Sequence, residues 1–202
     1  MLENKKEFKL ISKKNPRSLL PNALTIFGVC LGLSSIKFAL DANYAMSVIA
    51  IGFAAILDTL DGRVARLIKG TSKVGKELDS LTDVISFGVA PSFVMYFWTI
   101  NEIGKIGWMF ILIYTVCCAL RLARFNLTTV EDIESWKINF FEGVPSPAAA
   151  GLILLPLILN LSGFIELENI AIISSIVILT AAALMVSKIP TYSLKRILIP
   201  RN

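Results

Sequence analysis

The sequence predicts an all-α integral membrane protein. Hydrophobic residues make up 55% of the 202 residues, charged residues make up only 17%, and the mean hydropathy is +0.70. Soluble domains carry about 25% charged residues, so this composition is typical of a chain that lies mostly within a bilayer. A helix needs about 20 apolar residues to cross the hydrocarbon, which predicts a bundle of six transmembrane helices. The six segments are residues 20–40, 43–64, 81–100, 106–123, 145–163 and 169–187.

The positive charges support this arrangement. If the N-terminus lies in the cytoplasm, all but two of the 20 Lys and Arg residues fall on the cytoplasmic side. The exceptions are Lys37, within a predicted span, and Lys105, in an outer connection. Because cytoplasmic loops are enriched in Lys and Arg, we expect a multi-pass protein of the cell membrane with both termini in the cytoplasm. The net charge of +5 then reflects topology and contact with anionic lipid rather than nucleic-acid binding.

Two shorter segments flank the predicted membrane domain, residues 20–187. Residues 1–19 are basic with interspersed apolar side chains, which indicates either an amphipathic helix on the membrane surface or a solvated tail. Residues 188–202 are expected to form a basic cytoplasmic tail. The first apolar segment lacks the pattern of a cleavable signal peptide, so we expect it to remain as a span.

The residue types present restrict the chemistry. The three cysteines lie in apolar segments without metal-binding spacing, which indicates a packing role. The sequence contains no histidine. Proton transfer near neutral pH therefore depends on carboxylates, Lys, Tyr or Cys.

Four aspartates lie at the cytoplasmic ends of the second and third segments, namely Asp58, Asp61, Asp79 and Asp83. Spacings of three and four residues place each pair on one helix face, and adjacent antiparallel helices bring both pairs to the same membrane surface. Four carboxylates in one place repel one another, and a divalent cation relieves that repulsion. Oxygen ligands without Cys or His indicate Mg²⁺, Mn²⁺ or Ca²⁺ rather than zinc. The alternative is that the aspartates pair with nearby Lys and Arg residues at the membrane surface.

The full pattern from Asp58 to Asp83 is D-x2-D-G-x2-A-R-x8-G-x3-D-x3-D. It resembles the signature of the CDP-alcohol phosphotransferase family at every fixed position. The resemblance implies a homodimeric six-helix membrane enzyme that uses two divalent cations. These cations would be Mg²⁺ or Mn²⁺, with Ca²⁺ as a further possibility. Such enzymes transfer a lipid phosphoryl group from a CDP-lipid to an alcohol and release CMP. The implied metal ligands are Asp58, Asp61, Asp79 and Asp83, and Asp83 is also the implied catalytic base.

The same resemblance implies a site for the CDP head. Gly62 and Ala65 lack bulk, so a nucleotide can approach the helix closely, and Arg66 offers donors to phosphate oxygens. Gly75 would allow a close approach in the turn before the third segment, or tight helix packing. The start of the first segment also resembles the P-N-x-x-T sequence of the family and would close one side of the nucleotide site. The implied CDP-lipid contacts are Pro21, Asn22, Thr25, Gly62, Ala65, Arg66, Ser72 and Gly75.

Three stretches, residues 79–92, 121–126 and 141–150, resemble the phosphatidylserine synthase branch of the family. This resemblance implies L-serine as the acceptor and CDP-diacylglycerol or CDP-archaeol as the lipid donor. Arg121 and Arg124 would then neutralise the serine carboxylate, since their spacing places them on one helix face. They could equally contact the diphosphate or anchor the helix at the membrane surface. Further candidate contacts for serine are Asn126, Glu142 and Ser146.

Other functions predict different patterns. Transfer to glycerol 3-phosphate or to an inositol phosphate would demand a denser cluster of cations around the acceptor phosphate. A divalent-cation transporter would carry polar residues across the bilayer, whereas the outer halves of the second and third segments are apolar. A lipid-binding scaffold gives no reason for two pairs of aspartates. The sequence therefore favours a lipid phosphotransferase.

Overall fold

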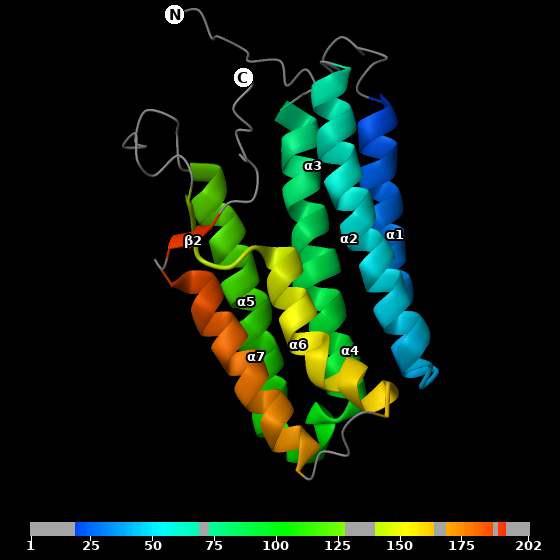
Figure 1. The fold of residues 1–202 in the computed structure, drawn as a ribbon, viewed down its shortest axis with the longest axis vertical. Coiled ribbons are helices and arrows are strands. Elements are labelled where there is room, and N and C mark those ends of the chain that lie inside the picture. The colour runs from blue at the N-terminus through cyan, green and yellow to red at the C-terminus, as the bar shows by residue number, and fades with distance from the viewer. Residues whose placement is uncertain (1–18, 69–72, 128–139, 164–168, 188–189, 193–202) are drawn as a thin grey trace, which may run out of the picture.

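The computed structural model describes residues 19–68, 73–127, 140–163, 169–187 and 190–192. The axes of its helices are roughly aligned with one another, and the helices form a single bundle (Figure 1). Residues 73–98 run on from α3 through a π-helical turn into α4. The elements are α1 (Leu19–Leu40), α2 (Tyr44–Leu67), α3 (Lys73–Asp83), η2 (Val84–Val89), α4 (Ala90–Trp98), η3 (Ile100–Ile103), α5 (Lys105–Leu127), β1 (Phe140–Glu142), α6 (Ser146–Leu161), α7 (Ile170–Val186) and β2 (Pro190–Tyr192).

The described residues include four helices that are long and apolar enough to cross a membrane. They span Leu20–Leu40, Tyr44–Val64, Gly75–Trp98 and Lys105–Asn126. The prediction of a helical membrane protein is therefore confirmed. Helices α6 and α7 are also apolar, but they have only 16 and 17 residues, so the count of six spans stays a prediction. Most of the two flanking segments lies outside the described residues.

The structure corrects the sequence prediction in two places. The third helix begins at Lys73 rather than near residue 81, because its first turns are amphipathic and an apolar segment search misses them. Gly75 consequently lies inside α3 and not in a turn before it. In addition, β1 and β2 form a short antiparallel ribbon with Phe140 opposite Tyr192. This ribbon leaves the helical fold class unchanged, and strands of three residues are too short to show an alternating pattern.

Pro91 explains the π-helical turn in the middle of the third helix. Proline has no N–H, so the carbonyl of Phe87, four residues earlier, lacks its usual helical donor. Residues Val84–Val89 adopt the wider π-helical turn, and the Tyr114 hydroxyl of α5 donates to the Phe87 carbonyl at 3.1 Å. Such local adjustments commonly satisfy backbone groups near prolines in membrane helices. The π turn begins directly after Asp83, so it links the packing of α4 to the position of that carboxylate.

Small residues allow α1 and α5 to approach this turn closely. A Cβ on Gly32 of α1 would lie 2.8 Å from the Ser86 Oγ, and one on Gly88 would lie 3.2 Å from the Cys118 Sγ. The Ser86 hydroxyl also donates to the Gly28 carbonyl at 3.4 Å. Close packing over small residues is a common way for membrane helices to associate. It holds the segment after Asp83 between two neighbouring helices.

The core and the outer surface are both apolar, as expected for helices in lipid. Val94, Tyr114, Ile153 and Ile178 are fully buried where α4, α5, α6 and α7 meet. Large apolar side chains also face outward, including Phe27, Phe53, Met109 and Val116. Lys37, the cation within a predicted span, lies in the last turn of α1 and forms an ion pair with Asp41. That pairing at the helix end avoids leaving an isolated charge in the hydrocarbon.

Candidate functional site

Three aspartates from α2 and α3 bring their carboxylates together. Carboxylate oxygens of Asp58, Asp61 and Asp79 lie within 4.8 Å of one another. Asp61 is buried, with 4% of its surface exposed, and the other two are half-buried. The fourth aspartate, Asp83, lies one helical turn beyond Asp79, within hydrogen-bonding reach of Asp58. The convergence expected from helix spacing and antiparallel packing is therefore present.

This cluster fits a hard divalent cation. The donor set consists of carboxylate oxygens, which Mg²⁺, Mn²⁺ and Ca²⁺ prefer, and like charges at this separation favour a compensating positive charge. The Asp83 Oδ1 is buried and has no hydrogen-bond partner among the described residues. A buried carboxylate oxygen without a partner is costly. The position is therefore suited to a ligand that this oxygen can contact.

Helix α1 contributes to the same centre. The Thr25 hydroxyl donates to Asp61 Oδ2 at 2.8 Å and also lies 3.0 Å from the Pro21 carbonyl. Thr25 and Pro21 are buried, whereas Asn22 is half-buried. The predicted P-N-x-x-T segment therefore reaches the aspartate cluster through Thr25.

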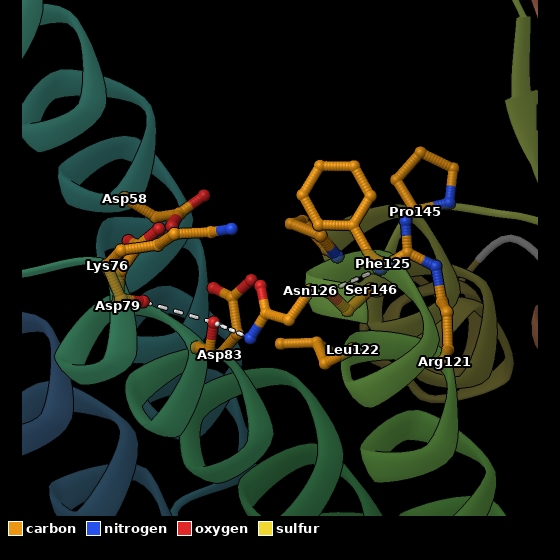
Figure 2. A pocket seen from close by; sticks show the side chains of 12 residues that line it. Asp58, Lys76, Asp79, Asp83, Arg121, Leu122, Phe125, Asn126, Pro145 and Ser146 are labelled. Carbon is orange, nitrogen blue, oxygen red and sulfur yellow. Dashed lines mark hydrogen bonds between the residues drawn. The ribbon is translucent and has the colours of Figure 1, made fainter. Parts of the chain in front are cut away.

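A cavity of about 250 Å³ extends from the aspartates toward α5 and α6. Figure 2 shows Asp58, Asp79 and Asp83 on one side and Arg121 with Ser146 on the other. Helix α6 begins deeper in the bundle than the neighbouring ends of α3 and α5 (Figure 1), which leaves room for this cavity. The lining residues are Asp58, Lys76, Asp79, Ser80, Asp83, Arg121, Leu122, Phe125, Asn126, Pro145, Ser146 and Pro147.

Arg121 is the cation of α5 in this cavity. Its Nη1 donates to the Ser146 Oγ at 3.3 Å, while its buried Nε has no partner among the described residues. A guanidinium offers five N–H donors, so Arg121 retains donors for an anionic ligand. Asn126 lies five residues further along α5 and donates from Nδ2 to the Ser80 Oγ at 2.9 Å. This bond joins α5 to α3 at the cavity.

Arg124 has different surroundings, although its spacing suggested the same face as Arg121. It is exposed and does not line the cavity. Its Nη1 donates to the Val186 carbonyl at 3.1 Å, at the C-terminal end of α7. Basic side chains commonly satisfy carbonyls at this end of a helix.

The segment before α6 is held against the same end of α7. Gly143 has a φ of +77°, and a Cβ there would lie 2.6 Å from the Met185 carbonyl oxygen. The Val144 N–H donates to the Leu184 carbonyl at 3.3 Å. Only glycine combines this backbone conformation with so close an approach. The contact places the following residues, among them Ser146, at the cavity.

Comparison with known proteins agrees with this geometry. The CDP-alcohol phosphatidyltransferase family matches residues 18–187. The chain belongs to this family. Curated relatives named CDP-diacylglycerol–serine O-phosphatidyltransferase include one from Mycobacterium leprae (strain TN), 44% identical over 133 residues, and one from Helicobacter pylori (strain ATCC 700392 / 26695), 41% identical over 185 residues. A third, from Methanocaldococcus jannaschii, is 38% identical over 144 residues.

These matches cover different shares of each relative. The alignment with the M. leprae protein covers 65% of this chain but only 44% of the relative, so this chain spans less than half of that protein's length. The corresponding shares are 91% and 76% for the H. pylori protein, and 70% and 62% for the M. jannaschii protein.

The remaining residues implied by the family resemblance differ in how exposed they are and in whether the structure describes them. Gly62 is exposed, and a Cβ there would contact nothing within 4 Å, so the helix surface is open at this point. Gly75 is half-buried within α3. Ala65 and Arg66 lie on α2, but their side chains are outside the described part of the structure, as is the side chain of Glu142 on β1. Ser72 lies outside the described residues altogether.

Several cavity residues were missed in the sequence. Lys76 and Ser80 are examples. Helical spacing could have identified both, because Lys76 lies three residues before Asp79, Ser80 lies four residues after Lys76, and such spacings place residues on one helix face. Phe125 carried no such signal, since an aromatic residue in an apolar helix is indistinguishable from a packing residue.

Proposed function

We propose that this chain transfers the phosphatidyl group of CDP-diacylglycerol or CDP-archaeol to L-serine and releases CMP. The observation that carries the proposal is the cavity with Asp58, Asp79 and Asp83 on one side and Arg121 on the other. The acidic side suits cations that bind a diphosphate, and the arginine suits the carboxylate of an amino acid. The names of the relatives support serine as the acceptor.

In this reaction the serine hydroxyl oxygen attacks the β-phosphorus of the CDP-lipid. A bond forms between that oxygen and the phosphorus, while the bond between the β-phosphorus and the oxygen bridging it to the α-phosphate breaks. CMP leaves with the bridging oxygen, and the hydroxyl proton passes to a base. No oxidation or reduction takes place.

Asp83 is the proposed base. It lines the cavity, and its buried Oδ1 has no partner among the described residues, so that oxygen is available to accept a proton from the acceptor hydroxyl. A base must lie within hydrogen-bonding reach of the proton that it removes. The chain contains no histidine to take this role.

Asp58, Asp61 and Asp79 would hold divalent cations, two in the proposal, with Asp83 beside the second. When bound, Mg²⁺ or Mn²⁺ would offset the negative charge of the diphosphate and stabilise the departing CMP. Gly62 leaves the surface of α2 open beside these aspartates, which suits a nucleotide lying against the helix. The remaining proposed CDP contacts are Pro21, Asn22, Thr25, Ala65, Arg66, Ser72 and Gly75.

Arg121 is the proposed partner of the serine carboxylate. Its Ser146 contact fixes one guanidinium nitrogen, and its remaining donors suit the paired oxygens of a carboxylate. Asn126 lines the same cavity and offers an amide oxygen to the serine amine. Arg124 contacts the end of α7 instead, so we assign it a structural role at the contact between α5 and α7, outside the serine site.

The membrane arrangement is part of the proposal. Residues 20–187 would form one catalytic domain with six spans, α6 and α7 included, in the cell membrane. The positive charges favour a cytoplasmic position for both termini and for the cavity. The lipid chains of the donor would remain in the bilayer while its CDP head lies over α2. The homodimer implied by the family resemblance stays a prediction.

The decisive test is CMP release by the purified protein in detergent with CDP-diacylglycerol and Mn²⁺ or Mg²⁺. We expect serine-dependent release that EDTA abolishes and added Mn²⁺ or Mg²⁺ restores. CDP-archaeol in a parallel assay compares the two lipid donors. CMP release that occurs with glycerol 3-phosphate or an inositol phosphate, but not with serine, would contradict the proposed substrate.

One observation favours an acceptor that carries phosphate. Lys76 lines the cavity with Arg121, and two cations suit a phosphate dianion better than one does. Glycerol 3-phosphate and inositol phosphate therefore belong in the same assay. The ratio of kcat/KM for serine to kcat/KM for each phosphate acceptor decides between them.

A further inference from the structure

Thr25 makes a contact that the nucleotide-binding role implied by the family resemblance does not explain. Its hydroxyl lies 2.8 Å from Asp61 Oδ2, although α1 and α2 place the two residues 36 positions apart in the sequence. Thr25 is 5% exposed and Asp61 is 4% exposed. A hydrogen bond between two buried side chains of different helices is a specific feature of the fold, since each group would otherwise be left unsatisfied.

The geometry shows which acceptor the hydroxyl serves. Pro21 O and Asp61 Oδ2 both lie within hydrogen-bonding distance of Thr25 Oγ1, at 3.0 and 2.8 Å. A hydroxyl has one proton to donate, and an ionised carboxylate is a stronger acceptor than a neutral carbonyl. The proton therefore points to Asp61 when that carboxylate is charged, which is the form that binds a cation.

This hydrogen bond restrains the Asp61 carboxylate. With Oδ2 held by α1, rotation of the carboxylate about its bond to Cβ is limited. The Gly62 backbone N–H also hydrogen-bonds this carboxylate, and its two oxygens have further lone pairs with which to bind a cation. Groups behind the direct ligands commonly orient those ligands, and removing one typically costs 10- to 100-fold in metal affinity. A restrained ligand loses less conformational entropy on binding.

We propose that Thr25 is a positioning residue of the metal centre, holding the Asp61 carboxylate in its cation-binding orientation. The inference rests on the proposed function in one respect, namely that Asp61 is a cation ligand. It differs in giving Thr25 an effect on cation affinity in the absence of any nucleotide. It also makes α1 part of the metal centre without supplying a ligand.

The test is Mn²⁺ binding to the purified protein, measured by isothermal titration calorimetry without CDP-lipid or serine. Thr25→Val keeps the shape of the side chain and removes the hydroxyl, and we expect its Mn²⁺ Kd to rise about 10- to 100-fold. Thr25→Ser keeps the hydroxyl and should retain an affinity within a few-fold of the wild type. Thermal unfolding without metal shows whether each variant is folded.

Thr82→Val is the matched control. Thr82 is also a buried threonine that faces α1, but its hydroxyl donates to the backbone carbonyl of Leu78 at 2.9 Å. Its loss should leave Mn²⁺ affinity unchanged. If Thr82→Val weakens Mn²⁺ binding as much as Thr25→Val does, packing of the bundle and not the Asp61 contact sets the affinity, and the inference is overturned.

The remaining outcomes separate this inference from the proposed function. If the wild type and the Thr25→Val variant bind Mn²⁺ with equal affinity, the proposed role of Thr25 is overturned and the proposed function remains intact. If that variant instead binds CDP-diacylglycerol more weakly, Thr25 is a nucleotide contact. A folded wild type that binds neither Mn²⁺ nor Mg²⁺ would overturn both.

Discussion

Asp83 has different surroundings from the three aspartates that cluster beside it. Asp58, Asp61 and Asp79 bring oxygens within 4.8 Å of one another, whereas Asp83 lies further along α3 with a buried oxygen that has no partner among the described residues. The cluster is suited to binding a cation. The Asp83 carboxylate also lies within hydrogen-bonding reach of Asp58, but its Oδ1 has no partner among the described residues and is suited to accepting a proton. This difference between neighbours of the same chemical type supports separate roles.

The base assignment predicts how Asp83→Asn behaves. An amide has nearly the same shape as the carboxylate but does not accept the hydroxyl proton, so kcat should fall by about 10²- to 10⁴-fold. CDP-diacylglycerol binding should change little, because the three clustered aspartates remain. Equilibrium binding of the lipid and single-turnover CMP release measure the two effects separately. Turnover at the wild-type rate would refute the role of Asp83.

Arg121 and Arg124 provide a second comparison of like residues. Arg121→Ala removes the cation from the cavity, and the loss of a charged hydrogen bond costs about 1.5–3 kcal/mol. We therefore expect the KM for serine to rise about 10- to 100-fold, with a smaller change in the KM for CDP-diacylglycerol. The opposite pattern would place Arg121 on the diphosphate.

Arg124→Ala is the control for that substitution. Arg124 contacts the Val186 carbonyl and does not line the cavity, so its loss should lower the thermal stability more than it changes the KM for serine. An equal rise in that KM for both variants would return Arg124 to the serine site.

The convergence of the aspartates could be predicted at the scale of residues, but the surroundings of the arginines could not. Helix periodicity and the expected antiparallel packing were sufficient to predict that Asp58 and Asp79 lie close together. The contact of Arg121 with Ser146 depends on where α6 begins, and that of Arg124 depends on where α7 ends. Neither position follows from the spacing of residues within α5.

At the scale of elements, the connection into α6 predicts a clear effect of Gly143→Ala. A Cβ at this position would lie 2.6 Å from the Met185 carbonyl oxygen, and the φ of +77° is unfavourable for alanine. We expect a loss of about 1–3 kcal/mol in stability, measured as a lower midpoint of thermal unfolding. The KM for serine should also rise, since Ser146 follows this turn.

Gly151→Ala is the matched control within α6. A Cβ there would contact nothing within 4 Å, and alanine favours a helix interior by about 1 kcal/mol relative to glycine. This variant should be as stable as the wild type or more stable. A Gly143→Ala protein with unchanged stability and kinetics would show that this turn does not position the cavity wall.

The third helix shows where pattern reading of elements reaches its limit. Its apolar part was predicted, but the amphipathic turns of α3 and the π turn before Pro91 were not. A proline in an apolar segment can end a helix, kink it or widen one turn. The outcome here depends on Tyr114, which donates to the Phe87 carbonyl from α5, and a single-helix pattern contains no information about that neighbour.

At the scale of the whole molecule, hydropathy and charge predicted a helical membrane bundle, which the structure confirms. The order in which the helices pack could not be predicted, and neither could the cavity that results from it. Both depend on contacts that composition does not encode, such as that of Gly32 with Ser86. The placement of the positive charges makes a further prediction about how the bundle is oriented in the membrane.

The orientation is testable by labelling introduced cysteines with a charged, membrane-impermeant maleimide in intact bacterial cells that express the chain. Glu102 is exposed at the end of the bundle opposite the aspartates, and Glu77 is exposed at the end that holds them. With the cavity in the cytoplasm, Glu102→Cys should react in intact cells. Glu77→Cys should react only after the membrane is permeabilised.

The wild type is the control for this labelling, because its three cysteines lie within α1 and α5, at positions that the membrane would shield. It should remain unlabelled in intact cells. The reverse pattern, with Glu77→Cys labelled from outside, would place the cavity on the face away from cytoplasmic serine and CDP-lipid head groups. That result would contradict the proposed orientation and require a source of both substrates outside the cell, even if the purified protein released CMP.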